Sequence, residues 1–338
     1  MTETVLRVIY NMIHELLSNN GWITPQIDYL VWLQNIRMQC GGVFDECFLS
    51  ITALGELLVP TSLICIIYWC INANAGLYLF TLNSLGLHIA HFMKMLACIY
   101  RPWVLSDRVK PIESALKMSG GYSFPSGHSA MASTTWGGMA FLLRNKKIIC
   151  TLLILMILLI AFSRTYVGVH TPQDVIIGVS IGLILVFVVH FLLKWCEKNK
   201  NRYLYSMVIF SLLVIWSAVY MVNKYYPMDY VDGKLLVNPS KAIYITILYS
   251  GWVMGMFDGA FLCKRFFPFD AKQGSLVNKI VRAFIGLAFI IGMFFGLNKY
   301  LFDEVWSYPV AFVVMFCLGF FITAVYPFIF TRINKMLK

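Results

Sequence analysis

Residues 121–130 read GYSFPSGHSA and place a proline, a serine, a glycine and a histidine directly in front of an apolar stretch of small residues. Pro125 suits the first turn of a helix, and Gly127 allows a ligand to approach the backbone closely. The unpaired amides of such a helix start carry positive potential, and the Ser126 hydroxyl adds a donor. The stretch therefore predicts an anion site beside His128. The alternative is a helix start followed by a small-residue packing face, with His128 as an incidental polar residue.

The composition around this stretch is that of a membrane protein. The chain has 338 residues, of which 59% are hydrophobic and only 13% charged, with a mean hydropathy of +0.74. These values are too apolar for a soluble domain of this length. The net charge of +11 comes without a basic stripe that has interleaved aromatic residues, which argues against nucleic acid as a partner.

Apolar stretches of about 20 residues, the length that crosses ~30 Å of hydrocarbon, predict about nine membrane spans. They lie at residues 47–70, 76–98, 126–143, 148–164, 174–195, 203–222, 242–263, 280–298 and 308–330. We therefore expect an all-α polytopic transmembrane helix bundle, because backbone amides in hydrocarbon must bond within their own helix. Apolar residues at helical spacing also predict short amphipathic N-terminal helices over residues 3–38, on the bilayer surface or packed on the bundle. In their second half the spaced residues are Leu30, Val31, Leu33 and Ile36.

Basic residues gather in the connections on one side of these predicted spans. They are Arg144, Lys146, Lys147, Lys194, Lys198, Lys200, Arg202, Lys264, Arg265, Lys272, Lys279, Arg332, Lys335 and Lys338. Lysine and arginine are enriched in short cytoplasmic loops, so this side is predicted to be cytoplasmic. The loops at residues 99–125 and 164–173 then lie on the extracytoplasmic side.

A second polar stretch on that side is KMLACIYRP, residues 94–102. Lys94 and Arg101 are seven residues apart, which is two helical turns and brings both cations to nearly one face. Two convergent cations favour an anion. Cations at helix ends also serve as ordinary interfacial anchors, and this alternative stays open for the stretch taken alone.

A third stretch, SRTYVGVHTPQD at residues 163–174, combines an arginine, a histidine and an aspartate. Arg164 offers a planar charged fork that suits phosphate, and His170 can attack or transfer a proton near neutral pH. Asp174, one turn beyond His170, can orient the imidazole and stabilise its charged form. The sequence also reads as a helix start, with Thr171 as its cap and Asp174 in its first turn; the two roles of Asp174 are compatible.

In this order the three stretches resemble the signature of the type 2 phosphatidic acid phosphatase (PAP2) superfamily, which is K-x6-RP, PSGH and SR-x5-H-x3-D. The signature is complete in Lys94, Arg101, Pro102, Pro125, Ser126, Gly127, His128, Ser163, Arg164, His170 and Asp174. The resemblance covers residues 47–195. Nine spans, with the amino terminus outside and the carboxyl terminus inside, are also similar to the glucose-6-phosphatase branch of this superfamily, although a span count is far less specific than the motifs.

The resemblance implies phosphoryl transfer that needs no metal ion and no other cofactor. His170 would be the nucleophile that forms a phosphohistidine, His128 the general acid and base, and Asp174 the group that orients His170. The implied phosphate-binding residues are Lys94, Arg101, Ser126, Gly127 and Arg164. The charges of these cations would stand in for a metal ion in the transition state.

We expect three parts: an amphipathic interfacial segment at residues 1–46, a PAP2-type catalytic core at 47–200, and additional C-terminal transmembrane helices at 201–338. The predicted function is an integral membrane phosphatase for a phosphomonoester or pyrophosphate of a lipid, phosphatidate-like or a polyprenyl pyrophosphate. Its site would face the extracytoplasmic side of a plasma membrane or organelle membrane. Membrane lipids and the phosphorylated lipid are the expected partners, and a homo-oligomer is compatible with the sequence.

Three other functions remain open. The same chemistry would serve a soluble sugar phosphate or the transfer of phosphate to another lipid. A transporter could use the same cations to bind an anion or lipid without turnover, but binding alone does not require the paired histidines.

Two acids within apolar runs, Glu56 and Asp258, are costly in a membrane and are usually functional or paired. Glu56 is placed to reach either the cations or a neighbouring helix.

Overall fold

The computed structural model describes residues 20–117, 119–231, 233–302 and 306–336. Its first half comprises the helices α2 (Asn20–Gln39), α3 (Asp45–Ala53), α4 (Leu58–Ile66), α5 (Ala73–Ala97), α6 (Pro102–Leu105), α7 (Glu113–Lys117), α8 (Gly127–Ala132), α9 (Gly138–Leu142) and α10 (Lys147–Tyr166). The second half comprises α11 (Pro172–Glu197), α12 (Asn201–Asn223), the short hairpin β1 (Tyr230–Val231) and β2 (Lys234–Leu235), α13 (Pro239–Phe266), α14 (Leu276–Phe302), α15 (Tyr308–Phe320) and α16 (Tyr326–Met336). Three π-helical turns continue neighbouring helices: η1 (Ile67–Ile71), η2 (Ser133–Gly137) and η3 (Phe321–Val325). The expected all-α architecture is confirmed.

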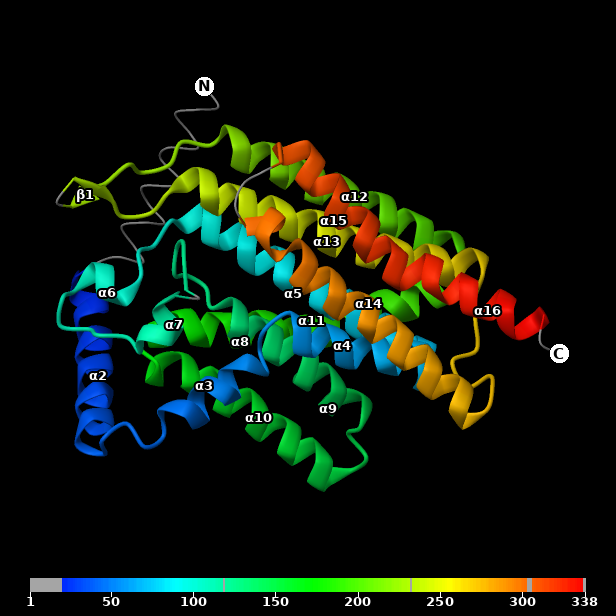
Figure 1. The fold of residues 1–338 in the computed structure, drawn as a ribbon, viewed down its shortest axis with the longest axis horizontal. Coiled ribbons are helices and arrows are strands. Elements are labelled where there is room, and N and C mark those ends of the chain that lie inside the picture. Colours follow the sequence, from blue (N-terminus) through cyan, green and yellow to red (C-terminus); the bar gives the residue numbers. More distant parts are fainter. Residues whose placement is uncertain (1–19, 118, 232, 303–305, 337–338) are drawn as a thin grey trace.

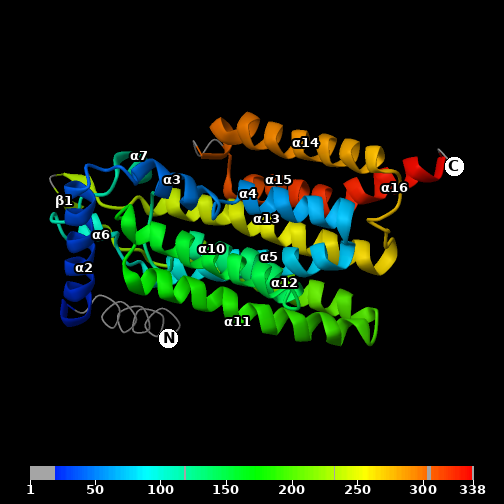
Figure 2. The same ribbon diagram turned by 90° about the horizontal axis from the view of Figure 1, so that it is seen from below.

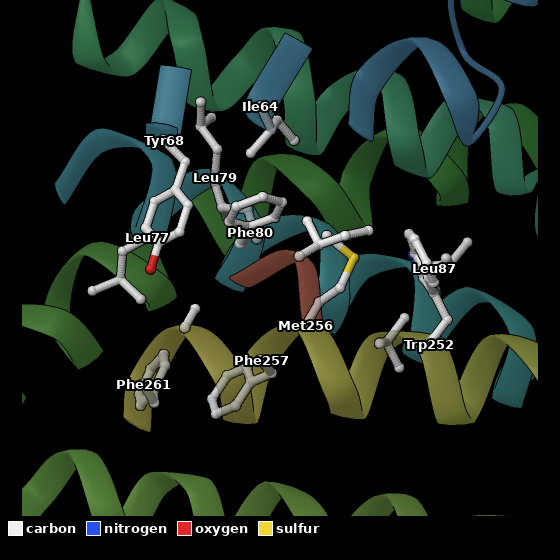
Figure 3. Packing of buried hydrophobic residues seen from close by; sticks show 14 of the residues in the cluster. Ile64, Tyr68, Leu77, Leu79, Phe80, Leu87, Trp252, Met256, Phe257 and Phe261 are labelled. Atoms are coloured by element: carbon white, nitrogen blue, oxygen red, sulfur yellow. The ribbon is translucent and has the colours of Figure 1, made fainter. Parts of the chain in front are cut away.

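The long helices run side by side along the molecule, with α13 in contact with α5, α12 and α15 (Figure 1). Apolar side chains of α5 and α13 meet in the largest buried cluster (Figure 3). Leu77, Phe80 and Leu87 come from α5, and Trp252 and Phe257 come from α13; all are buried. The dispersion contacts of these large side chains hold α13 against α5, whose C-terminal end carries Lys94.

Seven helical segments are long and apolar enough to cross a membrane, and a bent pair raises the number to eight. The seven are Ala73–Leu105, Lys147–Tyr166, Pro172–Glu197, Asn201–Asn223, Pro239–Phe266, Leu276–Gly296 and Tyr308–Ile333. The bent pair, Asp45–Ala53 with Leu58–Ile71, turns by 48° and corresponds to the first expected span. For the described part of the chain, the expected number of nine is therefore wrong.

The span expected at residues 126–143 is the one that falls short. It forms α8, η2 and α9, which together cover 16 residues, Gly127 to Leu142. At 1.5 Å per residue this rises ~24 Å, less than the ~30 Å of hydrocarbon that a full span must cross. The similarity to the glucose-6-phosphatase branch depended on nine spans and loses its basis with that number.

The helix α2 lies across one end of the bundle, roughly perpendicular to the long helices (Figures 1 and 2). Of its four apolar residues expected at helical spacing, Leu30 and Leu33 are buried, whereas Ile36 is exposed. Arg37 of α2 donates to the backbone carbonyl of Lys110 at 3.0 Å, so the helix covers the loop that follows α6. The part of the N-terminal prediction on residues 1–19 lies outside the described residues.

Two glycines of α11 allow the start of α8 and η2 to approach closely. A Cβ atom on Gly178 would lie 2.6 Å from the carbonyl oxygen of Ser126. One on Gly182 would lie 2.7 Å from Ser133 Cβ and 2.8 Å from the backbone nitrogen of Thr134. Because backbone atoms cannot move aside as a flexible side chain can, these positions require glycine. The contact fixes residues 126–134 against α11.

Substitution Gly182→Ala should destabilise the protein by about 1–3 kcal/mol, because the added methyl group overpacks the contact with η2. Gly292→Ala in α14 is the matched control, since a Cβ there meets no atom within 4 Å. The measurement is the melting temperature of each variant in detergent. Equal melting temperatures for wild type and Gly182→Ala would contradict this account of the packing.

Candidate active site

His170 lies in the turn between α10 and α11, and its two ring nitrogens contact different partners. Arg101 Nη1 lies 2.9 Å from His170 Nε2, and Asp174 Oδ2 lies 3.2 Å from His170 Nδ1. A guanidinium group has only donors, so Nε2 must be the acceptor. The proton of the neutral ring is then on Nδ1, directed towards Asp174. The contacts therefore select the tautomer that carries a lone pair on Nε2.

The environment of His170 keeps its imidazole neutral. The residue is 2% exposed, outside the membrane-spanning segments on either side of it. Burial lowers the pKa of His170 well below its ordinary value, and the nearby charges of Arg101, Lys94 and Arg164 lower it further. A neutral imidazole with an available lone pair is the form that attacks an electrophile.

Asp174 is fixed by the local chain at the start of α11. Thr171 is the N-cap residue of this helix and Pro172 occupies its first turn, which confirms the predicted helix start. Asp174 Oδ2 accepts hydrogen bonds from the backbone amide of Thr171 at 2.9 Å and from Ser123 Oγ at 2.6 Å. Both bonds hold the carboxylate beside His170.

Lys94 lies in the last turn of α5 and binds the loop in front of α8. Its Nζ donates to the carbonyl oxygens of Tyr122 at 3.0 Å, Ser123 at 2.9 Å and Pro125 at 3.1 Å. An ammonium group has three donors, and these contacts use all three. In this arrangement Lys94 holds the loop in shape and adds its positive charge to the surroundings of His170.

Arg101, which precedes α6, joins the same loop to the turn that holds His170. Its guanidinium group donates to the carbonyl oxygens of Gly120 at 3.0 Å, Gly121 at 3.3 Å and Val169 at 3.0 Å, in addition to His170. The side chain is 6% exposed. Such a buried, multiply bonded guanidinium fixes the two loops relative to each other.

Arg164, in the last turn of α10, does not use all of its hydrogen-bond donors within the described chain. Its Nη1 donates to Thr52 Oγ1 at 2.6 Å, and its Nη2 lies 3.5 Å from Ser119 Oγ. Within the described chain its Nε has no hydrogen-bond partner, although the residue is only 4% exposed. A buried charge without full compensation is costly, so this geometry favours an anion beside Arg164.

The PSGH motif forms the turn into α8. Ser126 caps this helix, and its hydroxyl accepts from the backbone amide of Ser129 at 3.3 Å. A Cβ atom on Gly127 would meet nothing within 4 Å, so the backbone there can be approached closely. The side chain of His128 is 26% exposed, and its Nε2 lies 3.9 Å from Glu56 Oε1.

Hydrogen bonds link the three motifs in every pairwise combination. Arg101 joins the first motif to His170 of the third, and Lys94 joins it to the carbonyl of Pro125 in the second. The amide of Ser126 donates to the carbonyl oxygen of Asp174 at 2.9 Å, which joins the second motif to the third. Residues spread over 80 positions of the sequence thus form one cluster of three cations, two imidazoles and a buried carboxylate.

Several residues that support this cluster carry no recognisable signal in the sequence. Ser123 bonds Asp174, and Thr52 and Ser119 bond Arg164. Ser119 and Ser123 lie in the loop directly before the PSGH motif, where nothing in their spacing distinguishes them from ordinary loop serines. Thr52 comes from a different span, 112 residues from Arg164, and only the fold brings it there.

The other polar residues of the spans have structural partners. Asp258 accepts a hydrogen bond from Ser211 at 2.7 Å, His88 lies 3.1 Å from Ser217 Oγ, and the His91 ring packs on Tyr249 at 4.3 Å between centroids. These contacts give His88 and His91 packing and hydrogen-bonding roles within the bundle.

Two family models match the chain. Residues 74–198 match the PAP2 superfamily, and residues 247–337 match the model described as PAP2 superfamily phosphatase, transmembrane extension. The chain is 31% identical over 156 residues to phosphatidylglycerophosphatase B of Bacillus subtilis, an alignment that covers 43% of this chain and 73% of that protein. It is 46% identical over 61 residues to an undecaprenyl-diphosphatase of Sulfolobus acidocaldarius, covering 18% of this chain and 29% of the relative.

Among solved structures, the chain is similar to the crystal structure of a transmembrane PAP2 type phosphatidylglycerolphosphate phosphatase from Bacillus subtilis. The identity is 23% and the TM-score 0.43, over 59% of this chain and 98% of the other. The family model over residues 74–198 covers all three motifs, and the alignment with phosphatidylglycerophosphatase B spans most of that relative. The chain therefore belongs to the PAP2 superfamily of membrane phosphatases and carries the transmembrane extension of that family.

Proposed function

We propose that this phosphatase hydrolyses the phosphate or diphosphate group of a membrane lipid through a phosphohistidine on His170, without a metal ion. One observation carries the proposal. The Nε2 atom of His170 contacts a cation and is the ring's acceptor, while Nδ1 is bonded to a carboxylate. This is the arrangement that a nucleophilic imidazole needs: a lone pair directed at an anion-binding region and a group behind the ring to stabilise the charge that develops.

In the first step, His170 Nε2 attacks phosphorus in line, and the bond to the leaving oxygen breaks. His128 donates a proton to that oxygen, so the lipid leaves as an alcohol or phosphate. Arg101 and Arg164, with the backbone at Gly127, stabilise the charge on the nonbridging phosphoryl oxygens, and the charge of Lys94 adds to this field. Asp174 stabilises the positive charge that the ring of His170 acquires.

In the second step, His128 has lost its proton and takes one from a water molecule. The resulting hydroxide attacks phosphorus, the bond between phosphorus and His170 Nε2 breaks, and inorganic phosphate is released. The two histidines thus return to their starting protonation states, and atoms and charges balance over the cycle.

A lipid substrate is supported by the setting of the site and by the relatives. The cluster lies at the ends of α5, α10 and α11, and the outer faces of α10 and α11 expose large apolar side chains such as Leu155 and Ile184. A lipid can therefore present its head group while its tails stay in the bilayer. The two relatives are named for phosphatidylglycerophosphate and undecaprenyl diphosphate. No comparable feature favours a soluble sugar phosphate.

We further propose that the site faces the extracytoplasmic side. The cluster lies at the end of the bundle that carries α2, α6 and α7, whereas the turns from α11 to α12 and from α13 to α14 lie at the other end (Figure 1). The first turn carries Lys198 and Lys200, the second carries Lys272, and Lys264 lies in the last turn of α13 just before the second. The enrichment of basic residues in cytoplasmic loops supports this orientation.

The proposed function predicts release of phosphate by the purified protein in detergent, with EDTA present, from phosphatidylglycerophosphate, phosphatidate or undecaprenyl diphosphate. Glucose 6-phosphate should be a poor substrate. His170→Ala should abolish release, because the substitution removes the proposed nucleophile. Normal turnover by His170→Ala would refute the nucleophile. A new phospholipid in place of free phosphate would show transfer to a lipid acceptor.

Asp174→Asn should lower kcat by about 10²–10⁴-fold while the protein still folds, because an amide cannot stabilise the charged ring of His170 and can favour the wrong tautomer. Ser123→Ala, which removes one donor to Asp174 but keeps the carboxylate, is the graded companion and should cost less. The measurement is phosphate release at saturating substrate. A kcat for Asp174→Asn within twofold of wild type would argue against a role for this carboxylate.

The neutral state of His170 predicts its titration. Since burial and neighbouring cations lower its pKa, the imidazole should stay uncharged at pH 6.5, where an ordinary histidine is half protonated. Nitrogen NMR of the protein labelled in histidine should show the ring proton of His170 on Nδ1. The signal of His170 is assigned as the one that disappears in His170→Gln. A signal that titrates at or above pH 6.5 without substrate would contradict the environment described.

A further inference from the structure

The turn between α3 and α4 brings a carboxylate to the second histidine of the site. Glu56 Oε1 lies 3.9 Å from His128 Nε2, and the two side chains are 40% and 26% exposed. This separation is longer than a hydrogen bond, but a small side-chain rotation brings it to the ~2.8 Å of a charge-assisted one. His128 Nε2 is buried and has no hydrogen-bond partner within the described chain. A buried polar atom without a partner calls for an explanation.

The backbone around Glu56 is shaped for this approach. A Cβ atom on Gly55 would lie 2.9 Å from Ile160 Cγ2 and 3.2 Å from the carbonyl oxygen of His128, so only glycine lets the turn pack against α8 and α10. The amides of Gly55 and Glu56 donate to the carbonyls of Thr52 and Ala53 at 2.9 and 3.1 Å, which makes the turn tight. Thr52 anchors the same segment to Arg164. These contacts fix the chain directly before Glu56, at the 48° break between the two helices.

We propose that Glu56 is the positioning residue of His128, as Asp174 is of His170, and that it stabilises the protonated form of the ring that donates to the leaving group. This inference rests on the proposed function, since it concerns the proton transfers of that reaction. An imidazolium has two N–H donors. With Nε2–H directed at Glu56, Nδ1–H is free to protonate the leaving oxygen, and after the first step Nδ1 can accept the proton of water.

A competing role for Glu56 is to balance the charge of Arg164. The two side chains lie close enough to interact electrostatically. However, Arg164 directs hydrogen bonds to Thr52 and Ser119, whereas the carboxylate of Glu56 lies against the ring of His128. The two roles predict different kinetics: loss of charge balance alters substrate binding and hence KM, whereas loss of support for His128 lowers kcat.

The test compares Glu56→Gln with wild type on two substrates with different leaving groups. One is phosphatidate, whose alkoxide leaves poorly without a proton; the other is 4-nitrophenyl phosphate, whose phenolate needs none. Glu46→Gln is the matched control, because it makes the same change on the exposed surface of α3. Melting temperatures of all three proteins are measured in the same detergent, to separate a kinetic effect from loss of folding.

With phosphatidate, Glu56→Gln should lower kcat by about 10–100-fold, with KM changed by less than about threefold, because the general acid is weakened but phosphate binding is not. With 4-nitrophenyl phosphate, the first turnover should proceed at nearly the wild-type rate. The second step still needs His128 as a base, so the phosphoenzyme accumulates and nitrophenol appears in a burst of about one per protein molecule. Glu46→Gln should behave as wild type.

Three results would overturn the inference. They are a wild-type kcat for Glu56→Gln on both substrates, a rise in KM at unchanged kcat, and an equal loss on both substrates without a burst. In each of these cases phosphate release by wild type and its loss in His170→Ala would leave the proposed function standing. A wild-type protein that releases no phosphate from any lipid phosphate or from 4-nitrophenyl phosphate would overturn the proposed function and this inference with it.

Discussion

The structure of the site depends on the burial of like charges at one end of a helix bundle. Lys94, Arg101 and Arg164 all lie close enough to His170 to act on its charge, and Asp174 is a fully buried carboxylate beside this ring. Repulsion and desolvation would both drive these cations apart. Backbone carbonyl groups hold them: three bind Lys94 and three bind Arg101. The irregular loop before α8 supplies five of these six carbonyls, which explains why it is not helical.

The chain that follows the PAP2 match over residues 74–198 also supports this end of the bundle. The helix α5 ends at Cys98 in a left-handed conformation, with φ of 51°, which turns the chain towards Arg101. A residue with a side chain is strained there. Lys224, which follows α12, donates to the carbonyls of Met95 and Leu96 at 2.7 and 2.8 Å, and such a cation stabilises the C-terminal end of a helix. The helices after residue 200 thus help to hold the cations of the first motif.

Much of the site could be predicted from the sequence because its residues sit at helix ends with fixed spacing. Asp174 lies one turn beyond His170 at the start of α11, and such a local distance follows from helix geometry. The expectation that Lys94 and Arg101 share one face of a helix is wrong, because α5 ends at Ala97 and Arg101 lies in extended backbone before α6. The two cations meet instead through their bonds to the loop before α8. The sequence marked Glu56 as a costly acid but could not name His128 as its partner, and it gave no signal for Thr52, because these contacts join segments far apart in the chain. The predicted number of spans was wrong for a related reason. Apolar composition predicted a full span at residues 126–143, but contacts with the surrounding structure decide where a helix ends.

The two histidines differ in the ways that their two proposed roles require. His170 is buried to 2% exposure and held on both ring nitrogens, so its orientation and tautomer are set before a substrate binds. His128 is more exposed, and its carboxylate neighbour lies beyond hydrogen-bond distance. A nucleophile gains from being fixed in place. A general acid and base such as that proposed for His128 must give a proton to one molecule and take one from another, so its ring needs freedom to move. A carboxylate neighbour such as Glu56 binds the ring more strongly when the ring is protonated. The same residue type thus acquires two properties from two environments.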